Sequence, residues 1–271
     1  MPQRRILVTG ASGALGDATV RSLREQGHLV RGFDCAGVRD ASPAESADHV
    51  VGNLEDVDAL YAAAEGAEVI VHFGAVPDRD DFVRRLVPVN IVGTYNLFEV
   101  ARMRAIPRVV YASSCRVLGA LDWTTETLTL EAGFAPGDHY GLTKATGELL
   151  GQLYSHRFSI TVLCARIGWF VRNRNEAARM STSEVGQRMY LSHRDAAAFF
   201  ELAVSLPLPR FSAVFVTSAN AGRPLGDPEP AARVLGYRGR DTWPEGSSWQ
   251  DDRWFPSPQG TSSLLPDRGE P

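Results

Sequence analysis

Residues 10–16 read Gly-Ala-Ser-Gly-Ala-Leu-Gly, and they join a short apolar run at residues 5–9 to a run with helical spacing at residues 15–26. The first run has the length and composition of a buried strand, and the second is typical of a helix. Glycine permits a tight turn and lets backbone amides approach a pyrophosphate, whose charge is stabilised at a helix N-terminus. The stretch therefore predicts a strand, a phosphate-binding turn and a helix.

The glycine spacing alone is also compatible with a turn that is merely flexible, and Asp34 decides between the two interpretations. This residue ends a second strand-like run at residues 29–34. A carboxylate in that place accepts hydrogen bonds from the ribose hydroxyls of adenosine. A 2'-phosphate would meet its negative charge, so the sequence favours NAD over NADP, although Arg31 and Arg39 flank the position and could soften the preference.

Strand-like and helical runs alternate along most of the remaining chain. We expect further helices at residues 55–64, 80–104, 138–156, 193–205 and 228–235, and strands at 68–72, 108–112, 159–165 and 213–217. Such alternation predicts an α/β fold, a Rossmann-type doubly wound parallel sheet with a small C-terminal substrate-binding region. We expect residues 1–165 to form mainly the NAD-binding core, 166–245 to hold substrate-binding elements interleaved with the last core strand, and 246–271 to form a flexible tail.

Composition excludes several classes of protein. The chain has 271 residues, of which 44% are hydrophobic, enough for one full core, and its net charge of -4 argues against a nucleic-acid surface. Cys35, Cys115 and Cys164 are too widely spaced for a zinc site, and the six histidines are scattered, so we expect no metal. The first apolar run is too short for a signal peptide or a membrane span, and we expect a cytoplasmic protein.

Tyr140 and Lys144 form a second pattern with chemical content. Four residues apart on a predicted helix, they lie on one face, where the ammonium holds the phenol closer to its ionised form. Beside a bound nicotinamide, such a phenol takes the proton of an alcohol while hydride leaves the same carbon. The pattern therefore predicts an NAD-dependent oxidoreductase with a small-molecule substrate.

Taken in order, these motifs resemble the extended short-chain dehydrogenase/reductase superfamily, the NAD-dependent epimerase/dehydratase type. The resemblance covers roughly residues 5–237. It rests on residues 9–16, Asn53 with Leu54, and residues 72–75, 90–96, 112–114 with Gly119, 140–144 and 166–168.

The resemblance implies a role for individual residues. Ser114, Tyr140 and Lys144 would be the catalytic triad, with Ser113 as the fallback for the serine, and Lys144 would also hold the nicotinamide ribose. Asn90 would lie below the active site or else simply bridge backbone, and His72 is expected to be a satisfied core residue. The cofactor-binding set would be Gly10, Ser12, Gly13, Ala14, Leu15, Gly16, Asp34, Asn53, Leu54, Phe73, Gly74, Ala75, Asn90, Tyr140, Lys144 and Ile167.

Within the superfamily the chain is most similar to uronate dehydrogenases, which oxidise C1 of a hexuronic acid to an aldarolactone. Arg179 would clamp the substrate carboxylate, for which a guanidinium fork is well suited. Alternatively, Arg179 simply belongs to a solvated basic loop. The implied substrate-binding set is Ser114, Cys115, Arg116, Trp169 and Arg179.

The chain also departs from that subgroup. Cys115, Arg116 and Trp169 replace polar residues, and Pro77 stands where a substrate-binding serine is expected. Another carboxylated, hydroxylated or cyclic alcohol or ketone is therefore an open alternative to a uronate.

Two other functions remain open on the sequence. A nucleotide-sugar epimerase or dehydratase would use the same triad but keep NAD tightly bound, and a non-catalytic NAD-binding sensor would need neither the tyrosine nor the lysine. The resemblance also implies a homodimer formed through the long helices at residues 80–104 and 140–154.

Overall fold

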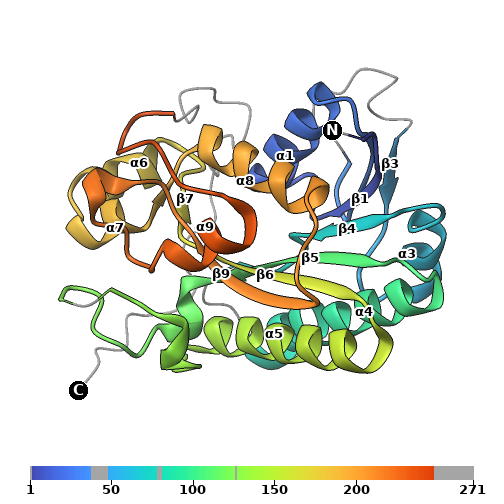
Figure 1. Ribbon diagram of the computed structural model, residues 1–271. Helices are drawn as coiled ribbons and strands as arrows, with labels where there is room; N and C mark the ends of the chain where they lie inside the picture. Colours follow the sequence, from blue (N-terminus) through green and yellow to red (C-terminus); the bar gives the residue numbers. More distant parts are fainter. Residues whose placement is uncertain (1, 38–47, 78–80, 126, 247–271) are drawn as a thin grey trace.

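The apolar runs of the sequence form a parallel sheet, which has seven strands among the residues that the computed structural model describes, namely 2–37, 48–77, 81–125 and 127–246 (Figure 1). The strands are β1 (Arg5–Thr9), β2 (Leu29–Asp34), β3 (His49–Val51), β4 (Val69–His72), β5 (Arg108–Ser114), β6 (Thr161–Ile167) and β9 (Phe211–Val216). Their order across the sheet is β3-β2-β1-β4-β5-β6-β9. Strand order reverses between β1 and β4, and this is the point where doubly wound sheets bind their ligands.

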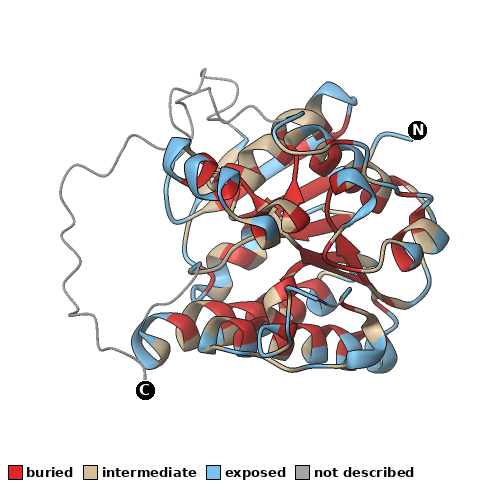
Figure 2. Cartoon of the chain, turned by 90° about the vertical axis from the view of Figure 1, so that its left-hand side faces the viewer, coloured by how far each residue is buried: buried red, intermediate tan, exposed pale blue. Residues whose placement is uncertain are grey.

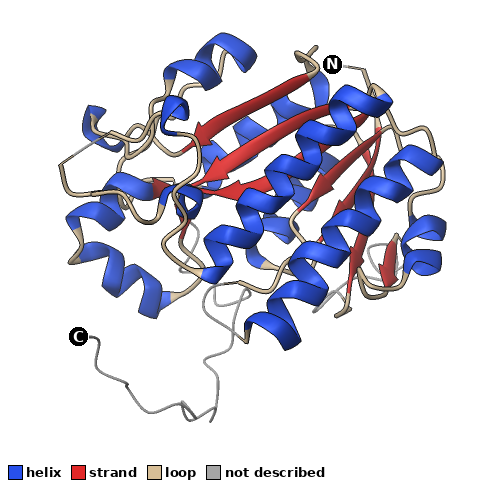
Figure 3. Ribbon diagram, turned by 90° about the horizontal axis from the view of Figure 1, so that it is seen from below, coloured by secondary structure: helices blue, strands red, loops and turns tan. Residues whose placement is uncertain are grey.

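Helices cover both faces of the sheet (Figures 1 and 3). One layer contains α1 (Ala14–Glu25), α8 (His193–Ser205) and α9 (Glu229–Leu235), and the other contains α3 (Val57–Ala63), α4 (Gly93–Met103) and α5 (His139–Phe158). A wide π-helical segment, η1 (Phe82–Val92), leads directly into α4. This architecture confirms the predicted doubly wound fold.

The two layers of helices enclose two apolar cores, one on each side of the sheet (Figure 2). Ile6 and Val8 of β1 pack with α1 and α8, whereas Leu7 between them packs with α3 and α4. Successive side chains of a strand point to opposite faces, so a strand covered on both sides must be apolar at every position. That is why the sheet strands appear in the sequence as continuous hydrophobic runs.

Every expected helix and strand is present, with boundaries shifted by a few residues. The expected helix at 80–104 is divided between η1 and α4, and β5 continues through Ser114. The sequence analysis missed β3 and a small lobe made of β7 (Trp169–Phe170), α6 (Arg174–Ser181), α7 (Glu184–Met189) and β8 (Tyr190–Leu191). The expected tail lies outside the described residues, except for Gly246.

The small lobe lies at the C-terminal end of β6 and has its own apolar centre, formed by Val171, Ala177, Met180 and Tyr190. Its two short strands, β7 and β8, pair in parallel. No helix in the described part of the chain has the length and apolar content needed to cross a bilayer. The same residues contain no cluster of histidine, cysteine, aspartate or glutamate fit to hold a metal ion.

Candidate active site

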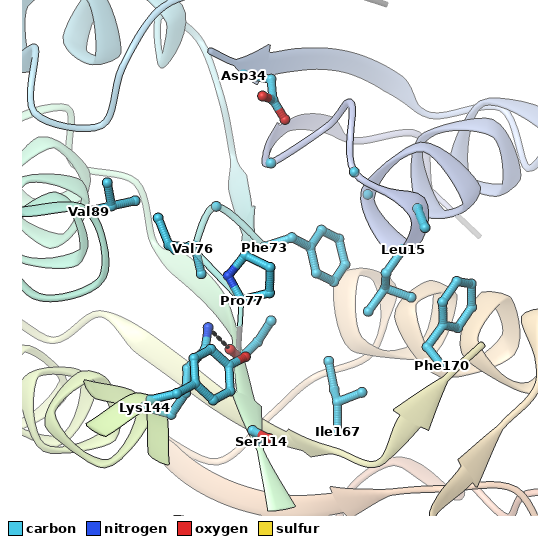
Figure 4. Close-up of a pocket in the computed structure, with 18 of the residues that line it drawn as sticks. Leu15, Asp34, Phe73, Val76, Pro77, Val89, Ser114, Lys144, Ile167 and Phe170 are labelled. Atoms are coloured by element: carbon cyan, nitrogen blue, oxygen red, sulfur yellow. Dashed lines mark hydrogen bonds between the residues drawn. The ribbon is translucent and has the colours of Figure 1, made fainter. Parts of the chain in front are cut away.

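A cavity of about 1030 Å³ opens at the C-terminal ends of the central strands. Asp34 lies at one end of it and Ser114 and Lys144 lie at the other, with Phe73 and Pro77 between them (Figure 4). The small lobe adds residues from β7, α6 and the end of α7 to the cavity wall. The cavity thus joins the sheet, where we expected a cofactor, to the lobe.

The glycine turn between β1 and α1 forms the wall nearest the sheet. Gly10 has a φ of 70°, and its N–H donates to the Phe33 carbonyl at 2.9 Å. A Cβ atom at Gly10 would stand 2.6 Å from the backbone nitrogen of Gly74, so the turn and the strand β4 end meet main chain to main chain. Gly13 begins α1 without any side-chain cap, which leaves backbone donors of its first turn available to an anion.

Asp34 ends β2 beside this turn, as expected. Its Oδ2 accepts the Ser12 N–H at 3.0 Å and its Oδ1 accepts the Ala36 N–H at 3.1 Å. Two backbone donors therefore fix the carboxylate, which retains lone pairs for a further partner.

The two arginines that could soften the choice of cofactor have different outcomes. The Arg31 guanidinium donates to the carbonyls of Ala63 and Glu65, at 2.8 and 3.2 Å, so it is directed toward the end of α3. Arg39 lies outside the described residues. Arg31 is not part of the cavity wall, and Asp34 is.

Asn90 supports the cavity from behind. Its side chain is 2% exposed, accepts the Val76 N–H at 2.8 Å, and donates to the Val76 carbonyl at 3.0 Å and to Thr143 Oγ1 at 3.2 Å. Asn90 is not among the residues that line the cavity. This corrects its assignment to the cofactor-contacting set, because all of its hydrogen bonds hold the segment after β4 against α5.

The two serines at the end of β5 face in different directions, as adjacent strand residues must. The Ser113 hydroxyl is committed to Glu148, to which it donates at 2.5 Å. Ser114 points into the cavity, where its Oγ accepts the Arg116 N–H at 3.2 Å (Figure 4). Of the two, Ser114 is the hydroxyl available to a ligand.

Tyr140 and Lys144 reach the cavity from the first turns of α5, whose N-terminus is capped by Asp138. The Lys144 ammonium donates to the Ala112 carbonyl at 2.9 Å and lies 5.6 Å from the centre of the Tyr140 ring. Lys144 is 4% exposed, and burial lowers the pKa of its ammonium from 10.5 to about 8. The cavity therefore contains a phenol, a hydroxyl and a buried cation in one place.

His72 lies just below this site and belongs to the core. Its ring nitrogens contact Thr9 Oγ1 at 2.6 Å and Thr94 Oγ1 at 3.2 Å. Burial lowers the pKa of the imidazole to about 3, so the ring is neutral at physiological pH. His72 is therefore a buried, hydrogen-bonded core residue, as the sequence analysis predicted.

The prediction that Cys115 contacts substrate is wrong. Cys115 begins the short 3-10 helix that follows Ser114, and its side chain is fully buried beside Val117 and Leu118. The Cys115 thiol donates to the Arg166 carbonyl at 3.5 Å. Burial raises the pKa of this thiol to about 12. Arg116, in contrast, lines the cavity and forms an ion pair with Asp138.

The lobe supplies the opposite wall of the cavity. Trp169 carries the Arg179 guanidinium over its ring, with 5.2 Å between the guanidinium carbon and the ring centre. Glu176 accepts the Arg172 Nε–H at 2.7 Å, the Arg172 backbone N–H at 2.9 Å and the indole N–H at 3.5 Å. Glu176 is thus neutralised by Arg172, whereas Arg179 forms no ion pair with any residue that the structure describes.

Of the candidate site residues predicted from the sequence, all but Asn90 and Cys115 line this one cavity. Sequence reasoning missed other residues on its wall. Nothing in the sequence marked Glu176, because its importance depends on α6, a helix that we did not expect. The missed wall residues include Val76, Arg84, Arg85, Pro88, Val89, Trp123, Gly168, Phe170, Glu176 and Met189.

Comparison with known proteins adds independent information. A model of the NAD-dependent epimerase/dehydratase family matches residues 6–185. An L-arabinose 1-dehydrogenase (NAD(P)(+)) from Haloferax volcanii is 35% identical over 258 residues, which cover 88% of this chain and 96% of that protein. A uronate dehydrogenase from Pseudomonas syringae pv. tomato is 32% identical over 222 residues, covering 81% of this chain and 76% of its own.

Comparison with solved structures also finds similarity to a uronate dehydrogenase. A variant of uronate dehydrogenase from Agrobacterium tumefaciens, crystallised in complex with NAD, superposes with a TM-score of 0.77 at 28% identity. The superposition covers 93% of this chain and 88% of that one.

Proposed function

The chain belongs to the NAD-dependent epimerase/dehydratase family, and on this premise we propose that it interconverts a hydroxyl and a carbonyl or lactone on a small sugar-acid-like substrate. It is an NAD-dependent dehydrogenase of the extended short-chain type, as its named relatives are, and NAD is its cofactor. The substrate, the catalytic residues and the direction of the reaction are the proposed part.

The residues present fit NAD. A Cβ atom at Gly10 or Gly16 would strike main chain, so only glycine permits this tight turn. The turn lines the cavity, and the uncapped start of α1 suits a pyrophosphate. Asp34 would accept from the adenosine ribose, and Asn53 and Leu54 would border the adenine. Bound NAD supplies the acceptor for the hydride. Its nicotinamide end would lie among Phe73, Gly74, Ala75 and Ile167.

Three side chains would handle the proton and the reacting oxygen. The Ser114 hydroxyl would hydrogen-bond that oxygen, and the Tyr140 phenolate would accept its proton during oxidation. The Lys144 cation, 5.6 Å from the ring centre of Tyr140, favours the phenolate electrostatically. In the reverse direction Tyr140 would return the proton to the carbonyl oxygen.

Arg179 would recognise the substrate carboxylate. Its guanidinium carbon lies 5.2 Å from the centre of the Trp169 ring, it lines the cavity, and it has no acidic partner in the described part of the chain. A planar fork of this kind binds carboxylates in a bidentate way. We propose accordingly that residues 1–165 mainly bind NAD and that substrate is bound by elements within residues 166–245.

The observation that carries the proposal is the meeting of Ser114, Tyr140 and Lys144 at one end of a cavity whose other end fits NAD. The test is a spectrophotometric screen for NADH with glucuronate, galacturonate, L-arabinose, other neutral sugars and small cyclic alcohols. Stoichiometric accumulation of NADH is expected with an acid. An epimerase would return the hydride to its substrate, so NADH would not accumulate. If neither uronate produces NADH with the NAD-loaded protein, the sugar-acid proposal is wrong.

Tyr140→Phe tests the catalytic assignment. The ring stays and the proton acceptor is lost, so turnover should fall by about 10²- to 10⁴-fold. Binding of NADH, followed by its fluorescence, should be retained. A variant that keeps wild-type turnover would remove Tyr140 from the mechanism, and a non-catalytic sensor would show no turnover to lose.

We further propose that the protein is a cytoplasmic homodimer. Tyr95 and Met103 of α4 and Leu142, Leu149 and Leu153 of α5 are 42–52% exposed, and these two helices lie side by side on one face of the molecule (Figure 3). A second copy of the pair would cover these apolar side chains. Light scattering should give twice the monomer mass, and Leu149→Glu should lower it.

A further inference from the structure

Helix α5 carries a third polar side chain on the face that holds Tyr140 and Lys144. Glu148 follows Lys144 by four residues and is therefore one helical turn farther along the same face. It is 2% exposed and is not among the residues that line the cavity. The mechanism proposed above does not use it.

The Glu148 carboxylate is hydrogen-bonded to two neighbouring strands of the sheet. It accepts from the Ser113 hydroxyl at 2.5 Å on β5, and from Nε and a terminal nitrogen of Arg166 at 3.0 Å each on β6. Ser113 and Arg166 are partners in the register of the sheet, so a single carboxylate joins α5 to both strands at the same level.

The next pair in that register is Ser114 and Ile167, and both point into the cavity (Figure 4). Adjacent residues of a strand face opposite ways. Fixing Ser113 and Arg166 toward α5 therefore fixes Ser114 and Ile167 toward the ligand. On the helix side, Glu148 belongs to the same helix as Tyr140 and Lys144, which line the cavity.

We propose that Glu148 is a positioning residue of the active site, whose carboxylate sets the separation between the Ser114 and Tyr140 hydroxyls by fixing α5 to the ends of β5 and β6. The proposal rests on the proposed function for what these hydroxyls do. It concerns the geometry of the reacting groups and requires no contact between Glu148 and a ligand.

The charge of Glu148 is essential to this role. The Arg166 guanidinium is 3% exposed and lies near the rings of Phe134 and Phe215, at 5.3 and 5.6 Å, so Glu148 is its counterion inside the protein. Removing one member of a buried pair leaves the other charge uncompensated. Glu148→Gln keeps the size of the side chain but removes its charge, so the Arg166 guanidinium loses its counterion and α5 is held less firmly to β5 and β6.

The helix offers a matched control at its other end. Glu99 of α4 also accepts from a hydroxyl, that of Tyr154 on α5, and from a guanidinium, that of Arg102. These groups are not part of the cavity wall. Glu99→Gln therefore weakens a hydroxyl–carboxylate joint between α4 and α5 without touching the reacting groups, although the Glu99–Arg102 pair lies within α4 and is partly exposed.

The experiment measures kcat, KM and NADH affinity for the two variants and for Ser113→Ala, using the acid or sugar that the wild type oxidises best. In Glu148→Gln, kcat should fall about ten- to a hundredfold while KM and the NADH Kd change less than about threefold. Ser113→Ala keeps the ion pair, and its kcat should fall about two- to fivefold. Glu99→Gln should keep kcat within about twofold of the wild type, whatever it loses in thermal stability.

Equal kcat values in Glu148→Gln and Glu99→Gln would overturn the proposal. If Glu148→Gln does not fold, an unchanged kcat in Ser113→Ala overturns it instead. Crystal structures of the wild type and of the folded variants with NAD give a readout that needs no substrate. Should the screen find no substrate, the proposed function fails, while an unchanged distance between Ser114 Oγ and Tyr140 Oη would separately defeat the positioning role.

Discussion

The two ends of the cavity are built in different ways. The end near β1 and β2 is made largely of main chain held by long, regular elements: the turn at Gly10, the start of α1 and the end of β4. The end near the lobe is made of large side chains on elements of two to eight residues. The end near β1 and β2 suits a ligand that does not vary, such as a cofactor. The residues at the lobe end can be substituted one by one without disturbing the sheet.

Electrostatics separates the sheet from the lobe as well. Lys144 is buried beside the end of β5, and burial shifts its pKa downward. Arg179 is exposed on the lobe, with its guanidinium over the ring of Trp169. We therefore expect substitutions near the turn to affect NAD first, and substitutions on the lobe to affect the substrate alone.

The largest effect should come from Gly16→Ala at the sheet end. A methyl group there would overlap the carbonyl oxygen of Gly10, which is backbone and cannot yield. NADH affinity, measured by fluorescence titration, should fall about a hundredfold or more, equivalent to roughly 3 kcal/mol. Gly37→Ala is the control, because no atom of the described residues lies within 4 Å of its Cβ position. Equal NADH affinity in the two variants would show that the turn does not need its close packing.

Arg179→Ala should have the next largest effect, at the lobe end. Loss of a charged hydrogen bond costs about 1.5–3 kcal/mol, so KM for an acidic substrate should rise about ten- to a hundredfold. NADH affinity and turnover of a neutral sugar should not change. A similar rise in KM for neutral sugars would mean that Arg179 supports the lobe and does not read the carboxylate.

A smaller effect should appear in the pH profile. The Lys144 ammonium has a pKa of about 8, so its charged fraction should decline about tenfold from pH 7 to pH 9. The kcat/KM for carbonyl reduction, in which a protonated Tyr140 donates, should decline with it. Arg179→Ala should show the same alkaline limb, since Arg179 lies on the lobe, whereas Lys144 lies beside β5. An alkaline limb that moves in Arg179→Ala would contradict the separation of the lobe from the sheet.

A loss of activity through unfolding can be distinguished from a loss caused by the titration of Lys144. Between pH 8 and 10.5 the unfolded chain keeps the Lys144 proton that the folded chain has released, so the contribution of Lys144 to stability increases as pH rises. Activity and this part of the stability change in opposite directions. Thermal melts across the same pH range provide the check.

The sheet end could be predicted from the sequence because its requirements are steric. Gly10 and Gly16 stand where any side chain would strike main chain, and Asp34 stands at the end of a strand, so residue type and position carried the information. The alternation of apolar runs predicted the fold for the same reason. Strands covered on both faces admit few other residues.

The lobe end could not be predicted in this way. Its helices are short, and the meaning of Glu176 comes from contacts with Arg172 and Trp169 that only the folded lobe creates. Cys115 was misassigned because sequence position does not reveal that a 3-10 turn directs its side chain inward. Asn90 was placed in the right neighbourhood, but its partners, the backbone of Val76 and the hydroxyl of Thr143, are a product of the tertiary structure.

The two amide contacts of Asp34 have a thermodynamic consequence. With each carboxylate oxygen already held by one main-chain N–H, the side chain has its rotamer chosen before any nucleotide arrives. A ribose diol can then be received without a loss of side-chain conformational entropy. We expect a 2'-phosphorylated ribose to bind less well, because turning the carboxylate aside would break both amide contacts.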